Sequence, residues 1–109
     1  MIDITDFDKV DVRVGTVLEA KENLKARHPA YILTIDFGEK IGVKKSSAQI
    51  TELYTPEDLV GRQVACCVNL QPMHIGSVKS EVRILGSDSA QGVVLLQPDR
   101  PVENGDRVF

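Results

Sequence analysis

Polar side chains gather in two short stretches that lie far apart along the chain. The first, "KKSSAQ", ends an apolar segment, and the second, "NLQPMHIGSVKSEVR", separates two apolar runs. Their amide, hydroxyl and ammonium groups make hydrogen bonds, so both stretches suit the binding of a polypeptide backbone or of nucleic acid. We predict that the binding residues are Lys44, Lys45, Ser46, Ser47, Gln49, Asn69, Gln71, Met73, His74, Ser80, Glu81 and Arg83.

Several of these residues have a purely structural alternative. Lys44 to Ser47 can be a solvated strand end, and Asn69 can bond its own backbone and hold a turn. Met73 and Ile75 can plug one end of a barrel, since a thioether adapts to irregular gaps. Glu81 and Arg83 lie two residues apart, which predicts a surface ion pair on one strand face.

Catalytic and metal-binding patterns are absent from the sequence. It contains no nucleophile elbow, no phosphate loop and no metal-ligand spacing, and neither His28 nor His74 has an obvious partner. Cys66 and Cys67 are adjacent, so a strand would point them to opposite faces as two small buried side chains. We therefore predict a protein that is not an enzyme and needs neither a metal nor another cofactor.

Charge and composition limit the classes of ligand. The 109 residues include 16 acidic and 13 basic side chains, so the basic excess of a dedicated nucleic-acid binder is missing. Tyr31 and Phe37 are too few for a base-stacking platform. No signal peptide and no apolar run of membrane-spanning length is present, so we expect one cytoplasmic domain, residues 1–109, without membrane insertion.

The periodicity of the first half predicts three strands and a helix. Even-numbered apolar residues from Val10 to Ala20, Leu18 among them, predict a half-buried strand, and Gly15 predicts a bend or bulge in it. After the connection "NLKARHP", strands follow at 31–37 and from residue 41 into "KKSS". Thr55, Pro56 and Asp58 form a capping-box pattern, which predicts a short helix from about Pro56 to Val60.

The second half contains further strand signals. "RQVACCVN", "EVRILG" and "GVVLLQP" are apolar, "ENGD" is a turn, and "RVF" ends the sequence. Three strands, a helix and two strands are the order of the all-β OB-fold, a five-stranded Greek-key barrel. In that fold residues 69–81 form the loop between strands four and five, beside the ligand face. The surplus apolar strand needs a partner, either an attached hairpin or, as we favour, a dimer interface.

Long stretches of the chain resemble one family, the tRNA-binding OB domain. "DVRVGTVLEA" is similar to its opening strand, "YTPEDLVGRQV" to its helix and following turn, and "NLQPMHIGSVKSE" to its loop. "IDFGEKIGVKKSSAQIT", "SEVRILG" and "VVLLQPDRPVENGDRVF" are similar to the CsaA-type subgroup, which consists of small export-related chaperones. The resemblance covers nearly the whole chain.

The resemblance implies a homodimer of OB-folds joined through the N-terminal segment and the C-terminal strands. It also implies a chaperone that binds unfolded precursor polypeptides in a cleft and contacts the translocation ATPase. The alternative is binding of tRNA or another structured RNA, for which Lys44, Lys45, Lys79 and Arg83 supply positive charge.

The sequence departs from the family pattern at the ligand-facing positions. Gln71 replaces a lysine, Met73 and His74 replace basic residues, and residues 48–50 read Ala-Gln-Ile where relatives read Ser-Gly-aliphatic. Each lost phosphate contact weakens RNA binding and flattens its salt dependence. A less charged, methionine-containing surface suits apolar polypeptides better, so we predict polypeptide as the main ligand.

Overall fold

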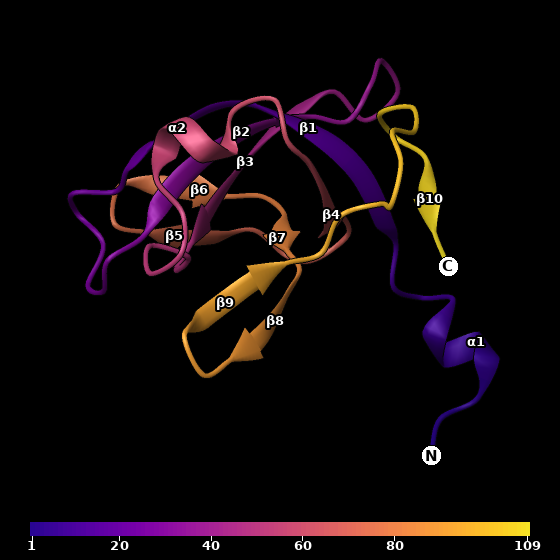
Figure 1. Cartoon of the computed structure of the whole chain (residues 1–109). Coiled ribbons are helices and arrows are strands. Elements are labelled where there is room, and N and C mark those ends of the chain that lie inside the picture. The colour runs from indigo at the N-terminus through magenta and orange to yellow at the C-terminus, as the bar shows by residue number, and fades with distance from the viewer.

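The computed structural model describes residues 1–109, and its main sheet is the predicted OB-fold barrel. Five antiparallel strands are hydrogen-bonded in the order β3-β2-β1-β4-β7, with the short helix α2 between β3 and β4 (Figure 1). β10 also pairs with β1, and the hairpins β5–β6 and β8–β9 are separate two-stranded sheets. The elements are α1 (Ile4–Phe7), β1 (Val12–Glu22), β2 (Tyr31–Asp36), β3 (Val43–Ala48), α2 (Pro56–Leu59), β4 (Gln63–Cys67), β5 (Met73–Ile75), β6 (Val78–Ser80), β7 (Arg83–Ile84), β8 (Gly86–Ser89), β9 (Gly92–Leu95) and β10 (Arg107–Val108).

Strand β1 runs through the middle of the sheet, and the predicted buried face is only partly correct: Val14 is buried and Ala20 packs against the core, as expected. Leu18 and Val10 are exposed, whereas Gly15 and Val17 are buried. A β-bulge between Val17 and Glu19 shifts the register, so one alternation cannot describe the whole strand. Gly15 permits a close approach rather than a bend, since a Cβ there would lie 2.6 Å from Ile35 Cγ2.

The barrel core is built mainly from β2 and its neighbours. Leu33, Ile35 and Phe37 are almost completely buried, and Leu59 joins the same core cluster from α2. Burying one such side chain contributes about 1.5–3 kcal/mol to the free energy of unfolding. The core therefore holds β1, β2, β3 and β4 in place as a rigid support for the surface beside β3.

Helix α2 begins with the predicted capping box. The Asp58 backbone N–H donates to Thr55 Oγ1 at 3.3 Å, and the Thr55 N–H donates to Asp58 Oδ2 at 3.1 Å. The bonds from the Thr55 backbone and hydroxyl lower the pKa of the Asp58 carboxyl. The helix ends at Leu59, one residue before the predicted end, because Val60 has extended backbone.

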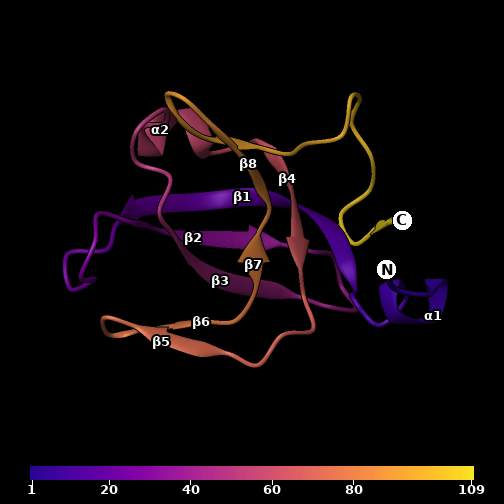
Figure 2. The ribbon, with the colours of Figure 1, turned by 90° about the horizontal axis from the view of Figure 1, so that it is seen from below.

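Two further segments differ from the expectation. Residues 69–81 are not a plain loop, because β5 and β6 pair within them around Gly76, whose φ is +66°. The surplus strand β9 pairs with β8, so the attached-hairpin alternative is correct for that strand. Helix α1 was not predicted, and it lies beside the C-terminus at the side of the barrel away from the β5–β6 tip (Figure 2).

No helix in the structure has the length and apolar character needed to cross a membrane.

The two cysteines are free and buried, as predicted. Burial raises the pKa of the Cys66 thiol to about 12, and the neighbouring Cys67 adds to the shift. Because the thiolate is the reactive form, we expect Cys66 in a Cys67→Ala variant to resist iodoacetamide at pH 8. In denaturant it should react completely, as measured by mass spectrometry. Equal rates in the two conditions would contradict the buried position.

Candidate binding cleft

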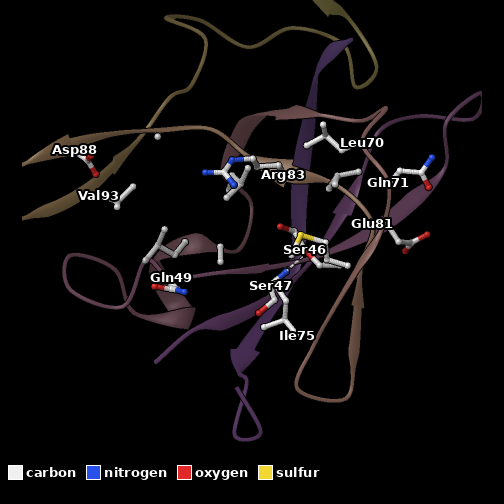
Figure 3. A pocket seen from close by; sticks show the side chains of 17 residues that line it. Ser46, Ser47, Gln49, Leu70, Gln71, Ile75, Glu81, Arg83, Asp88 and Val93 are labelled. Atoms are coloured by element: carbon white, nitrogen blue, oxygen red, sulfur yellow. Dashed lines mark hydrogen bonds between the residues drawn. The ribbon is translucent and has the colours of Figure 1, made fainter. Parts of the chain in front are cut away.

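A cleft of about 600 Å³ lies between the end of β3, the β5–β6 hairpin, β7 and the β8–β9 hairpin (Figure 3). This volume is typical of ligand sites in proteins. The side chains that form it come from four separate parts of the sequence, which the barrel brings together. They are Ser46, Ser47, Ala48, Gln49, Ile50, Leu70, Gln71, Met73, Ile75, Ser80, Glu81, Val82, Arg83, Ile84, Gly86, Asp88 and Val93.

The cleft combines an apolar floor with a polar rim. Ala48, Ile50 and Val82 are buried at its base, and the exposed side chains of Leu70 and Met73 also line it. Gln49, Gln71, Glu81, Arg83 and Asp88 lie around the opening, and no Phe, Tyr or Trp lines it (Figure 3). Such a surface buries aliphatic side chains and hydrogen-bonds to the backbone that carries them, but it offers no aromatic ring for base stacking.

One wall of the cleft is held to β3 by Ser80 and Glu81. The Ser47 N–H donates to Ser80 Oγ at 3.0 Å, and the Lys45 N–H donates to Glu81 Oε1 at 3.1 Å. Glu81 also pairs with Lys44, at 3.8 Å between Oε2 and Nζ, so the predicted ion pair with Arg83 is wrong. These bonds satisfy the outer edge of β3, so Ser80 and Glu81 hold the wall in position.

Asn23 ties three elements together behind the cleft. Its buried side-chain Nδ2 donates to Ser47 Oγ on β3 and to the Ile75 carbonyl on β5, each at 3.0 Å. The turn at Gly76 also lies against the β1–β2 loop, since a Cβ there would lie 2.8 Å from the Lys25 carbonyl carbon. The position of the β5–β6 hairpin over the cleft therefore depends on Asn23.

We expect Asn23→Ala to lower the free energy of unfolding by about 1–3 kcal/mol, because it leaves buried polar groups without a partner. It should also increase amide hydrogen exchange at residues 73–80, measured by mass spectrometry. Asn69→Ala is the matched control, because Asn69 bonds to Lys9 and Asp11 instead. If hairpin exchange were equally slow in both variants, Asn23 would have no positioning role.

The structure places most, but not all, of the predicted binding residues in the cleft. Ser46, Ser47, Gln49, Gln71, Met73, Ser80, Glu81 and Arg83 line the cleft, and His74 lines a neighbouring hollow. Lys44, Lys45 and Asn69 line neither. Asn69 does not hold its own turn, since its side chain accepts from the Asp11 N–H at 3.0 Å and donates to the Lys9 carbonyl at 2.7 Å. Met73 is exposed, so it does not plug the barrel.

Sequence reasoning missed the residues that the other loops contribute. Arg27 and His28, in the segment taken only as a connection, line the hollow beside His74. Asp88 and Val93 reach the cleft from the β8–β9 hairpin. The signal for the first pair was the basic run "KARH", but its neighbour was unknown until the loop was placed against the hairpin. No group of three or more His, Cys, Asp or Glu side chains is arranged to hold a metal ion.

Comparison with known proteins gives the class to which this barrel and cleft correspond. The family model of the tRNA binding domain matches residues 12–107. Among curated relatives, the methionine–tRNA ligase of Methanothrix thermoacetophila is 42% identical over 105 residues, which are 96% of this chain and 15% of the ligase. The enzyme of Flavobacterium johnsoniae is 36% identical over 109 residues. The chain thus spans about 15% of the length of these ligases.

Two solved structures match this chain over its full length. Chaperone CsaA from Bacillus anthracis is 47% identical with a TM-score of 0.93, and the match covers 100% of this chain and 99% of that one. The CsaA chaperone protein from Picrophilus torridus is 43% identical with a TM-score of 0.95, and the match covers both chains completely. The chain belongs to the tRNA-binding-domain family of OB-folds, and within that family it is similar over its full length to the CsaA chaperones.

Proposed function

We propose that the protein is a non-catalytic chaperone that binds unfolded polypeptide segments in the cleft beside β3. The observation that carries this proposal is the apolar floor of the cleft, surrounded by amide and charged groups. Aliphatic side chains of a client would lie against Met73 and Ile84, while the client backbone would bond to Gln49 and Gln71. The full-length similarity to CsaA chaperones supports the same function.

The clients that fit this proposal are cytoplasmic precursors of exported proteins, with the translocation ATPase as a further partner. The test is light scattering from a client that aggregates on dilution from denaturant. At a ratio of one cleft to one client chain, we expect the protein to reduce the light scattering strongly. A client segment bound in the cleft is not available to aggregate with other client chains. Unchanged scattering at a molar excess of the protein would overturn the proposal.

A homodimer is the second part of the proposal. Ile4, Phe7, Val108 and Phe109 are exposed apolar side chains on two chain ends that lie side by side (Figure 1). An apolar patch of this kind is typical of an interface between subunits. A dimer formed through this patch would carry two clefts and could hold one long client at two points.

We expect the molar mass from multi-angle light scattering to be twice that of the chain. Phe7→Asp should shift the protein toward monomer, because it places a charge in the apolar contact. Leu53→Asp is the control, since Leu53 is an exposed leucine outside both chain ends. A wild-type monomer at high concentration would contradict the dimer.

Binding of tRNA or another structured RNA is the second candidate function. The family match supports it, as do the cations predicted for this role, which are Lys44 and Lys45 on β3, Lys79 on β6 and Arg83 on β7 in the lining of the cleft. Gel shifts with tRNA over a salt series distinguish the two candidates, because each neutralised phosphate steepens the salt dependence. Absence of a shift at the lowest salt concentration would exclude RNA.

A further inference from the structure

A second hollow of about 280 Å³ lies between the β1–β2 loop, the end of β3 and the β5–β6 hairpin. Ser47, Gln49 and Ile75 line both this hollow and the cleft. The two spaces are therefore neighbours that share one wall, and an extended ligand in the cleft can continue into the hollow.

The basic side chains that line this second hollow have no acidic neighbour in the lining. Arg27, His28 and His74 line it, and no Asp or Glu does, although the chain has more acidic than basic residues. None of the three forms a salt bridge. Lys79 lies opposite His74 across the hairpin and adds to the positive charge. The hollow thus presents donors and cations that are not neutralised within the protein.

We propose that this hollow is a carboxylate subsite, which takes an Asp or Glu side chain of the polypeptide held in the cleft. The inference rests on the proposed chaperone function. A guanidinium binds a carboxylate through two parallel hydrogen bonds, and a neutral or protonated imidazole donates a further one. The segments that bind best would then have aliphatic residues next to an acidic residue.

The surroundings favour a polypeptide over an RNA phosphate at this site. Neither space is lined by Phe, Tyr or Trp, so bases that follow a bound phosphate would find no aromatic ring on which to stack. They would instead meet the apolar floor formed by Ala48, Ile50 and Val82. A polypeptide segment with an acidic residue among apolar ones would place its carboxylate in the hollow and its aliphatic side chains in the cleft.

The test uses two fluorescent peptides with the same aliphatic residues that differ only in one Glu or Gln at their end. Fluorescence anisotropy should show the Glu peptide binding about tenfold more tightly, which is the effect of one charge-assisted hydrogen bond. Arg27→Gln should reduce the ratio between the two affinities to about one. Lys40→Gln, which removes one exposed positive charge outside both spaces, should keep the ratio near tenfold.

The outcomes separate this inference from the proposed function. Equal affinities of the two peptides for the wild-type protein would overturn the carboxylate subsite and leave the polypeptide cleft standing. Binding of neither peptide would overturn both. If Arg27→Gln weakened the binding of tRNA but left the ratio between the peptides unchanged, the hollow would be assigned to RNA phosphate and the inference would be wrong.

Discussion

Replacement of Met73 by aspartate is expected to weaken the binding of an aliphatic peptide by about 10- to 100-fold. Met73 is 64% exposed in the unliganded structure, yet it lies in the lining of the cleft, so a client side chain can cover it. Covering a methionine side chain contributes about 1.5–3 kcal/mol, and each 1.4 kcal/mol changes the dissociation constant tenfold. A carboxylate at this place would also lose part of its hydration when the peptide binds.

The measurement is isothermal titration calorimetry with an uncharged aliphatic peptide, followed by the aggregation assay. Val43→Asp is the matched control, since Val43 is also an exposed apolar residue in a strand but lines neither the cleft nor the hollow beside it. Equal affinities of the two variants would show that peptides bind elsewhere. Thermal unfolding of both variants confirms that the barrel itself is unchanged.

Replacement of Phe37 by alanine is expected to lower the free energy of unfolding by about 3–5 kcal/mol, the usual cost of removing a buried aromatic ring. Phe37 is 1% exposed and packs within the core cluster that includes Leu33 and Ile35. Its ring also lies against Gly15, where an added Cβ would come within 2.8 Å of Phe37 Cδ1. Few side chains can refill the space, because β1 has no side chain at that position.

Urea unfolding followed by circular dichroism measures this loss at one fixed protein concentration, since the proposed dimerisation would add to the apparent stability. Leu24→Ala is the control, because Leu24 is 85% exposed; we expect its effect to stay within about 0.5 kcal/mol. A loss below about 1 kcal/mol for Phe37→Ala would mean that the ring is not a core element. Peptide affinity of the folded fraction should change little, because Phe37 does not line the cleft.

Local sequence signals were sufficient where neighbouring residues decide the structure. Thr55, Pro56 and Asp58 predicted α2 because a capping box depends only on residues three apart. The alternation of Leu33, Ile35 and Phe37 predicted β2, since successive strand residues point to opposite faces. The order of these elements was enough to predict the OB-fold, and with it the face on which Ser46, Ser47 and Gln49 lie.

The same local signals gave wrong predictions where a contact between residues far apart in the sequence determines the structure. The buried face of β1 changes at the bulge after Val17, and that bulge fits the strand to its partner β2. Glu81 pairs with Lys44 rather than Arg83 because β3 lies beside β6 in the folded barrel. The sequence did not predict a role for Asn23, because its hydrogen-bond partners Ser47 and Ile75 are 24 and 52 residues away in the chain.

The sequence by itself therefore determined the barrel, its helix and the chemistry available on the predicted ligand face, because capping, alternation and side-chain type are local properties. Only the tertiary structure decided which of those side chains share one cleft. It turned residues 69–81 into a hairpin, held that hairpin through Asn23, and brought Arg27 and His28 beside His74. The physical reason is that a loop's position depends on hydrogen bonds to residues far away in the chain, and these exist only once the core has folded.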